Sequence, residues 1–182
     1  SQSVQVCREG WQMSGLACLA HEGTALSDTT AITASNIKSK IIDGRKAIRK
    51  QKASANVVLA SVDTYSAMLE EAGDKFTPIA NDEMFQTGQV GRYLGMVWVE
   101  CNMLDLTAAA KYYDHTGTLQ TEDLSKIEYI MYDWRGFHIV DLLTMARLID
   151  SENFNGSLAQ VEIVSGYRLG DKNYAVVKKK SA

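Results

Sequence analysis

Apolar and polar positions in the first third of the chain recur at the spacing of helices. The apolar stretch Trp11–Ala20 stops before Gly23 and a polar turn, which predicts a short helix. Because this stretch begins close to the chain start, we expect it to be the end of a longer element. A second helix is expected from Ser35, a suitable N-cap, to about Lys52. Apolar residues fall on one side of it and basic residues on the other: Ile37, Ile41 and Ile48 against Lys38, Arg45, Lys46 and Arg49. We interpret the basic side as a solvated surface, with a partner site as the alternative.

A short β-branched run follows at Val57–Val62 and predicts a strand that is buried on both faces. Asp63 is placed to cap a further helix, with core-facing side chains at Tyr65, Met68, Leu69 and Ala72. A helix, a buried strand and a helix in succession indicate a mixed layer of helices and sheet.

The periodicity disappears between Gly73 and Gln89, where charged residues mix with isolated apolar ones. This pattern predicts a long loop, and loops of such length in compact domains usually have a function. The loop carries enough apolar side chains to dock on a neighbouring molecule.

The second half of the chain is richer in strands. Glycines at 88, 91 and 95 lead into a strand at 96–100, and Ile127–Tyr132 is another. The stretch 134–149 fits neither the helical nor the strand period. Three further strands are expected at Gln160–Val164, Gly166–Leu169 and Tyr174–Lys178, the last two joined by a turn at 170–173.

Composition narrows the classes of protein. A chain of 182 residues with 46% hydrophobic residues buries one sizeable core or two small lobes. The net charge of -3 gives no general attraction to nucleic acid, and no apolar run reaches the length of a membrane span, so we expect a soluble protein. Cys7, Cys18 and Cys101 are odd in number and widely spaced, which favours buried free thiols in a reducing cytoplasm.

The residues that carry chemistry do not form a known motif. His21, His115 and His138 are scattered without metal-ligand spacing, and the glycines near 88–95 precede a strand instead of opening a phosphate-binding helix. We therefore expect no metal, no cofactor and no catalytic residue, and predict that the protein is not an enzyme. Asp114 and His115 would form a catalytic pair only if a nucleophile approached them in space.

Three segments, taken in their order along the chain, resemble the major capsid (coat) proteins of tailed bacteriophages. They are NIKSKIIDGRKAIRKQKASANVVLASVDTYSAMLEEAG, GQVGRYLGMVWVECNML and VEIVSGYRLGDKNYAVVKKK. In that family an amphipathic helix leads to an apolar strand, a capped helix and a loop toward the capsomer axis. A glycine-led strand and closing strands follow. The resemblance covers about residues 30 to 180.

The resemblance implies an α+β chain with the phage major capsid (Johnson) fold, in which a mixed-sheet axial domain is flanked by helices. It places the end of the spine helix and the peripheral-domain connection at residues 1–54 and the axial domain at 55–160. Strands returning to the peripheral domain occupy 161–182. Within the predicted loop it implies subunit contacts by Phe76, Asn81, Asp82, Met84 and Phe85.

The function implied is that of a structural subunit of a phage or prophage icosahedral capsid. Such subunits form pentamers and hexamers around double-stranded DNA, so the partners are other copies of the chain, a possible scaffold protein and, indirectly, packaged DNA. No membrane partner is implied. Assembly takes place in the bacterial host cytoplasm, and the final location is the virion.

One departure from the family pattern concerns the N-terminal arm, the extended loop and most of the spine helix. No room exists for them before Trp11. We therefore expect a truncated or processed piece, or a divergent relative, that is monomeric or weakly associated in dilute solution. A stable closed shell detected by light scattering would contradict this expectation.

Two alternatives remain open. An encapsulin-like nanocompartment shell has the same architecture but encloses protein cargo. A small α/β enzyme or ligand-binding domain would instead use a cleft near Asp114, His115 and the loop 73–89, and it predicts a deep pocket with perturbed ionisable groups.

Overall fold

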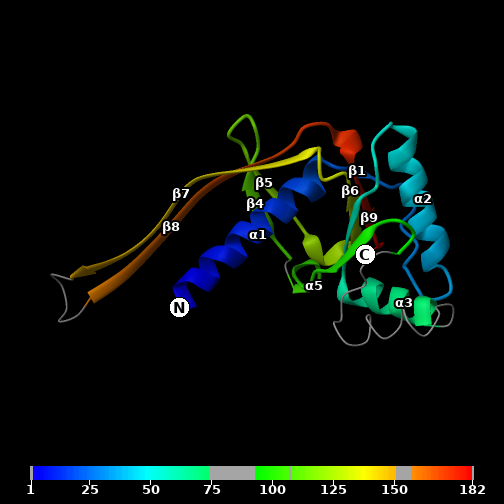
Figure 1. Cartoon of the computed structure of the whole chain (residues 1–182), viewed down its shortest axis with the longest axis horizontal. Helices are drawn as coiled ribbons and strands as arrows, with labels where there is room; N and C mark the ends of the chain where they lie inside the picture. Colours follow the sequence, from blue (N-terminus) through cyan, green and yellow to red (C-terminus); the bar gives the residue numbers. More distant parts are fainter. Residues whose placement is uncertain (1, 74–92, 107, 151–156, 182) are drawn as a thin grey trace.

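The computed structural model describes residues 2–73, 93–106, 108–150 and 157–181. A five-stranded mixed sheet forms its centre (Figure 1). The strands lie in the order β1 (Thr24–Ala25), β9 (Ala175–Lys179), β6 (Ile127–Tyr132), β2 (Val57–Ala60) and β3 (Val97–Glu100). The pairs β1–β9 and β2–β3 are parallel, whereas β6 runs antiparallel to both of its neighbours. This mixed sheet with helices confirms the predicted α+β class.

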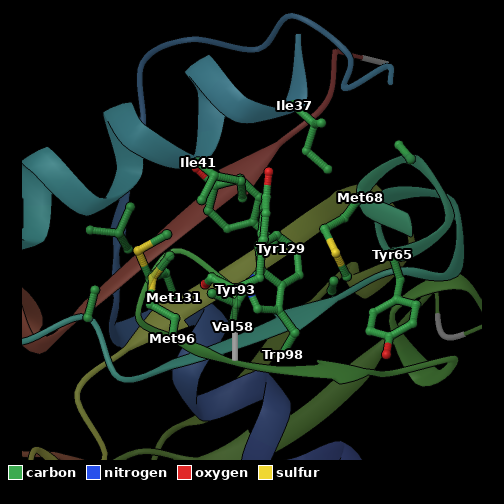
Figure 2. Close-up of a cluster of buried hydrophobic side chains, with 14 of the residues drawn as sticks. Ile37, Ile41, Val58, Tyr65, Met68, Tyr93, Met96, Trp98, Tyr129 and Met131 are labelled. Atoms are coloured by element: carbon green, nitrogen blue, oxygen red, sulfur yellow. Dashed lines mark hydrogen bonds between the residues drawn. The ribbon is translucent and has the colours of Figure 1, made fainter. Parts of the chain in front are cut away.

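Helix α2 (Ile37–Lys50) covers one face of this sheet and follows the predicted amphipathic pattern. Its isoleucines at 37, 41 and 48 are fully buried, and Figure 2 shows Ile37 and Ile41 pointing from α2 toward the sheet. The helix starts after Asn36, so Ser35 is not the N-cap. Asn36 instead uses its side-chain oxygen to accept a hydrogen bond from the Thr33 N–H at 2.8 Å, which closes the preceding turn.

Helix α3 (Val62–Gly73) lies on the same face and begins one residue before the predicted cap Asp63. The Ser61 hydroxyl accepts a hydrogen bond from the Thr64 N–H at 3.3 Å and is itself buried, so Ser61 caps the helix. Tyr65, Met68 and Ala72 face the core as predicted, whereas Leu69 is only partly buried.

The opposite face of the sheet packs against helix α1 (Gln2–Glu22) and a small hairpin, β4 (Ala110–Tyr113) with β5 (Leu119–Glu122). The predicted helix Trp11–Ala20 is therefore the second half of a longer one. The hairpin was not predicted from the sequence. The short helix α5 (Met103–Leu106) and the 3-10 turn η1 (Leu124–Lys126) complete this side. Strand β2 is shorter than the predicted Val57–Val62, and only one of its faces is fully buried: Val58 and Ala60 are buried beneath the layer of α2 and α3, whereas Val57 and Leu59 on the other face are partly buried. The predicted burial on both faces is therefore confirmed for one face only.

A second hairpin, β7 (Phe137–Asp150) with β8 (Ser157–Leu169), extends away from the sheet (Figure 1). Strand β7 covers most of the stretch that fitted neither period. Strand β8 is one strand where two were predicted, with Ser165 paired to Asp141 at the break.

The turn at 170–173 does not join two strands of one hairpin. It contains the beginning of the 3-10 turn η2 (Lys172–Tyr174) and carries the chain from the projecting hairpin back into the central sheet as β9. The last two strands are therefore consecutive in sequence but belong to different sheets, because β8 pairs with β7 and β9 pairs with β6 and β1.

Candidate intersubunit surface

The five residues predicted to contact neighbouring subunits lie outside the described residues. They are Phe76, Asn81, Asp82, Met84 and Phe85. Their role stays a prediction. The surfaces that the structure does describe were not singled out by the sequence, and they lie on the β7–β8 hairpin and beside α1.

The base of the β7–β8 hairpin is fixed to α1 by two hydrogen bonds that share Trp11. The Trp11 indole N–H donates to the Asp141 carboxylate at 3.1 Å, and the Tyr167 hydroxyl donates to the Trp11 carbonyl at 2.8 Å. Gly15 lies one turn further along α1, where a Cβ atom would come within 3.3 Å of the Tyr167 ring. The absence of a side chain at Gly15 therefore lets the hairpin pack closely on the helix.

The hairpin carries apolar side chains that the described residues of the chain leave exposed. Leu142 is 76% exposed and Leu148 is 77% exposed. Four more apolar residues of the hairpin are at least one-third exposed: Ile139, Val140, Ile149 and Val164. A two-stranded hairpin alone is only marginally stable in water, and clustered exposed apolar residues mark contact sites. We therefore identify this hairpin as a candidate intersubunit surface.

An apolar groove runs between α1, the β3–α5 connection and the start of β7, with a volume of about 320 Å³. Leu16, Leu19, Val99, Met103 and Phe137 are among the residues that line it. Cys101 also lines the groove, and burial raises the pKa of its thiol above the usual range, which keeps the sulfur protonated. The groove is suited to apolar contact more than to nucleophilic chemistry.

Cys18 lies in the core beneath this groove and is fully buried. Burial, with the Glu22 carboxylate as a second cause, raises the pKa of the Cys18 thiol to about 12. The prediction of buried free thiols is confirmed for Cys18, and Cys101 is partly exposed. The side chain of Cys7 is outside the described part of the chain.

The residue pair that the enzyme alternative depends on has a structural role. The Asp114 carboxylate accepts hydrogen bonds from the Thr116 and Thr118 N–H groups and from the Gln120 amide, all within the turn between β4 and β5. These bonds hold its pKa below the usual range. Among the described residues no hydrogen bond joins Asp114 to His115. The carboxylate is therefore used to close a turn, which does not favour a catalytic pair.

No group of three or more His, Cys, Asp or Glu side chains is positioned to hold a metal ion in the described ranges. None of the helices described is long and apolar enough to cross a membrane.

Comparison of the whole fold with solved structures gives the class of protein. The chain matches a structure described as the capsid of the cyanophage P-SCSP1u with a TM-score of 0.69, at 13% identity over 99% of its length. It matches a structure from Mycobacterium phage Che8 with a TM-score of 0.65, at 15% identity over 97% of its length. The chain therefore has the fold of phage capsid proteins, as the resemblance implied.

The matched capsid chains are longer than this one. The chain spans 65% of the cyanophage chain and 59% of the Che8 chain. The chain is also similar to the crystal structure of a virus-like particle from Pyrococcus furiosus, with a TM-score of 0.50 and 12% identity over 98% of its length. No protein-family model matches the sequence, and no curated protein does.

Proposed function

We propose that the chain is a structural subunit of a phage or prophage icosahedral capsid, which self-assembles into pentamers and hexamers around double-stranded DNA. The observation that carries this proposal is the agreement of nearly the whole chain with phage capsid structures at TM-scores of 0.65 and 0.69. In this role the chain acts by its shape and its contact surfaces and performs no catalysis.

The projecting hairpin gives independent support for self-assembly. Its exposed leucines at 142 and 148 would be covered by a neighbouring subunit, and covering apolar surface is the main favourable term in association. A subunit that makes several modest contacts at once gains from effective concentration what no single contact supplies. Repeated weak contacts also let misplaced subunits dissociate.

The domain division proposed from the sequence has residues 55–160 as the axial domain and 161–182 returning to the peripheral domain. In the structure β9 adds to the sheet that also holds β2, β3 and β6. We propose on this basis that the axial domain is centred on the five-stranded sheet, with α1 and the β7–β8 hairpin as the peripheral part. Capsid location in the virion, assembly in the host cytoplasm and recruitment by a scaffold protein belong to the same proposal.

The full-length gene product, expressed in bacteria, tests the proposal directly. Sedimentation followed by cryo-electron microscopy is expected to show closed shells with fivefold and sixfold capsomers. Finding a monomer at every concentration, scaffold protein included, would overturn it.

The match to the Pyrococcus furiosus particle favours one second candidate, an encapsulin-like compartment that encloses protein. Analysis of shell contents separates the two. A phage capsid retains nuclease-protected DNA in infected or induced cells, whereas a compartment retains a single cargo protein and no DNA.

A further inference from the structure

Charge is strongly segregated on this chain. The segment 38–52, which includes most of α2, holds seven of the 19 Lys and Arg residues and one of the 22 Asp and Glu residues. The described segments 53–73 and 93–106, which include β2, α3, β3 and α5, hold five Asp and Glu residues and no Lys or Arg. A protein whose net charge is only -3 therefore has one basic and one acidic region.

The basic residues of α2 are free to meet a partner. Lys40 pairs with Asp28, but the other six of this segment are exposed, and none lies within 4 Å of a carboxylate in the described part of the chain: Lys38, Arg45, Lys46, Arg49, Lys50 and Lys52. Lys46 and Lys50 line a groove of about 310 Å³ together with Asp43 of α2, Thr24 of β1 and Val176 of β9. The basic side thus faces the β1 edge of the sheet.

The acidic residues gather at the opposite edge. Strand β3 is the last strand on that side and carries the exposed Glu100. The Asp105 carboxylate of α5 accepts a hydrogen bond from the Val62 N–H at 2.9 Å, which brings α5 to the start of α3 and next to the exposed Asp63. Glu70 is exposed on α3. We call this surface the acidic side and the α2 surface the basic side.

Helix α2 packs over β9 and β6, α3 packs over β6, β2 and β3, and the two helices contact each other. The lysines of the basic side therefore lie toward the β1 edge of the sheet, and Glu100 lies at the β3 edge. Helix α2 lies at the end of the molecule away from the β7–β8 hairpin (Figure 1), whereas Glu100 of the acidic side lines the groove that Phe137 and Ile139 of β7 also line. In a ring of identical subunits every copy uses two different surfaces, one toward each neighbour. Opposite charges on two opposite ends of a subunit match this requirement.

We propose that the basic side of α2 docks against the acidic side of the next copy of this chain, around Glu70 and Glu100, and so sets the direction in which subunits join within a capsomer. The inference rests on the proposed capsid function. The acidic partner is a second copy because the chain carries the complementary surface itself. Charge pairs of this kind fix register and raise the rate of correct encounter more than they raise affinity.

Charge swapping in the full-length protein tests the inference. Lys46→Glu with Lys50→Glu lowers the formal charge of segment 38–52 from +6 to +2, and Glu70→Lys with Glu100→Lys changes that of segments 53–73 and 93–106 from -5 to -1. Each double variant is expected to raise the concentration needed for assembly on the order of tenfold at about 0.05 M salt, with a smaller effect at about 0.5 M. The variant carrying all four changes has opposite charges at the four substituted positions again and is expected to recover most of the assembly.

A mixture of the two double variants gives a second readout. If each double variant joins only to the other, the two kinds of subunit must alternate around a ring, which is possible with six subunits but not with five. The mixture is therefore expected to form sheets or tubes of hexamers and no closed shells. Lys111→Glu with Lys180→Glu makes the same change in net charge without altering the four tested positions and is expected to assemble normally. Thermal melting of each variant confirms that it folds.

The outcomes separate this inference from the capsid proposal. If the wild-type protein forms shells but the variant with all four changes assembles no better than the double variants, the charge inference is wrong and the capsid proposal stands. Shells that form normally from the Lys46 and Lys50 variant but retain less DNA would also overturn it, and would assign the basic side to nucleic acid. If the wild-type protein forms rings or filaments but no shells, and the double variants weaken this association, the result would support the inference and contradict the capsid proposal. A wild-type protein that never associates would overturn both.

Discussion

The hydroxyl of Tyr129 lies where a Cβ atom on Gly44 would come within 2.5 Å of it. Tyr129 is fully buried on β6, and its hydroxyl donates a hydrogen bond to the Lys40 carbonyl at 3.0 Å. Figure 2 shows the Tyr129 side chain standing between the sheet and α2. Glycine at position 44 therefore lets helix α2 approach the sheet closely enough for this bond to form.

Gly44→Ala is expected to lower the free energy of unfolding. Overpacking of a core costs about 1–3 kcal/mol, and the better helix propensity of alanine returns at most about 1 kcal/mol. A net loss of up to about 2 kcal/mol is expected in urea unfolding. Gly10→Ala is the matched control in α1, where nothing lies within 4 Å of the added Cβ, and it is expected to stabilise slightly. Adding Tyr129→Phe removes the clashing hydroxyl, so the double variant should lose less than the sum of the single changes. Strict additivity would contradict the contact.

Asp133 is expected to make the fold sensitive to acid. Its fully buried carboxylate accepts hydrogen bonds from the Ser54 N–H at 2.9 Å, the Asn56 amide at 3.0 Å and the Arg135 guanidinium at 2.7 Å. Chiefly because of Arg135, the pKa of Asp133 falls to about 2 from the ordinary 3.8. A lowered pKa contributes stability above pH 3.8 that is lost as the pH falls toward 2.

Asp133→Asn should remove that part of the acid dependence and cost about 1–3 kcal/mol of unfolding free energy at pH 7. Unfolding by urea at a series of pH values measures both effects. Asp43→Asn, at an exposed position, serves as the control and is expected to change stability by less than about 0.5 kcal/mol. Equal stability of the Asp133 variant and the wild type at pH 7 would show that the network is not stabilising.

The hairpin leucines are expected to matter for assembly and not for folding. Leu142→Ser with Leu148→Ser changes side chains that are 76% and 77% exposed, so the unfolding free energy should change by less than about 0.5 kcal/mol. Shell yield of the full-length protein, measured by sedimentation, should fall severalfold because the apolar contact is lost. Tyr113→Ser, on β4 and 70% exposed, tests whether any exposed apolar residue would have the same effect. Unchanged yield of the leucine variant would remove the hairpin from the intersubunit surface.

Met84→Ser with Phe85→Ser tests the contact residues predicted from the sequence. In an assembly-competent full-length protein the variant is expected to form fewer capsomers without unfolding, as judged by electron microscopy and circular dichroism. Normal capsomers would exclude both residues from the interface.

Much of the central fold follows from local pattern. Strand β6 has the predicted bounds, and α2 buries the predicted isoleucines because a 3.6-residue repeat leaves only one apolar side to cover. The hairpin β4–β5 was missed because its strands are four residues long and carry polar residues such as Lys111 and Gln120. Strand β7 was missed for the opposite reason. Its apolar residues occupy both faces, so neither period appears, and several of them are exposed in the part of the chain that the structure describes.

The amino-acid sequence by itself determined which segments are helix or strand in the sheet-forming part, the order that resembles capsid proteins, and the lack of a recognisable catalytic motif. Those properties depend on neighbours along the chain. The tertiary structure alone decided that β8 and β9, which are adjacent in sequence, enter different sheets. It also left Leu142 and Leu148 of the β7–β8 hairpin exposed. Finally, it brought the basic residues of α2 toward one edge of the central sheet and Glu100 to the other. Such relationships depend on contacts between residues far apart in the sequence, such as Trp11 and Tyr167, which are 156 positions apart. No local pattern records them.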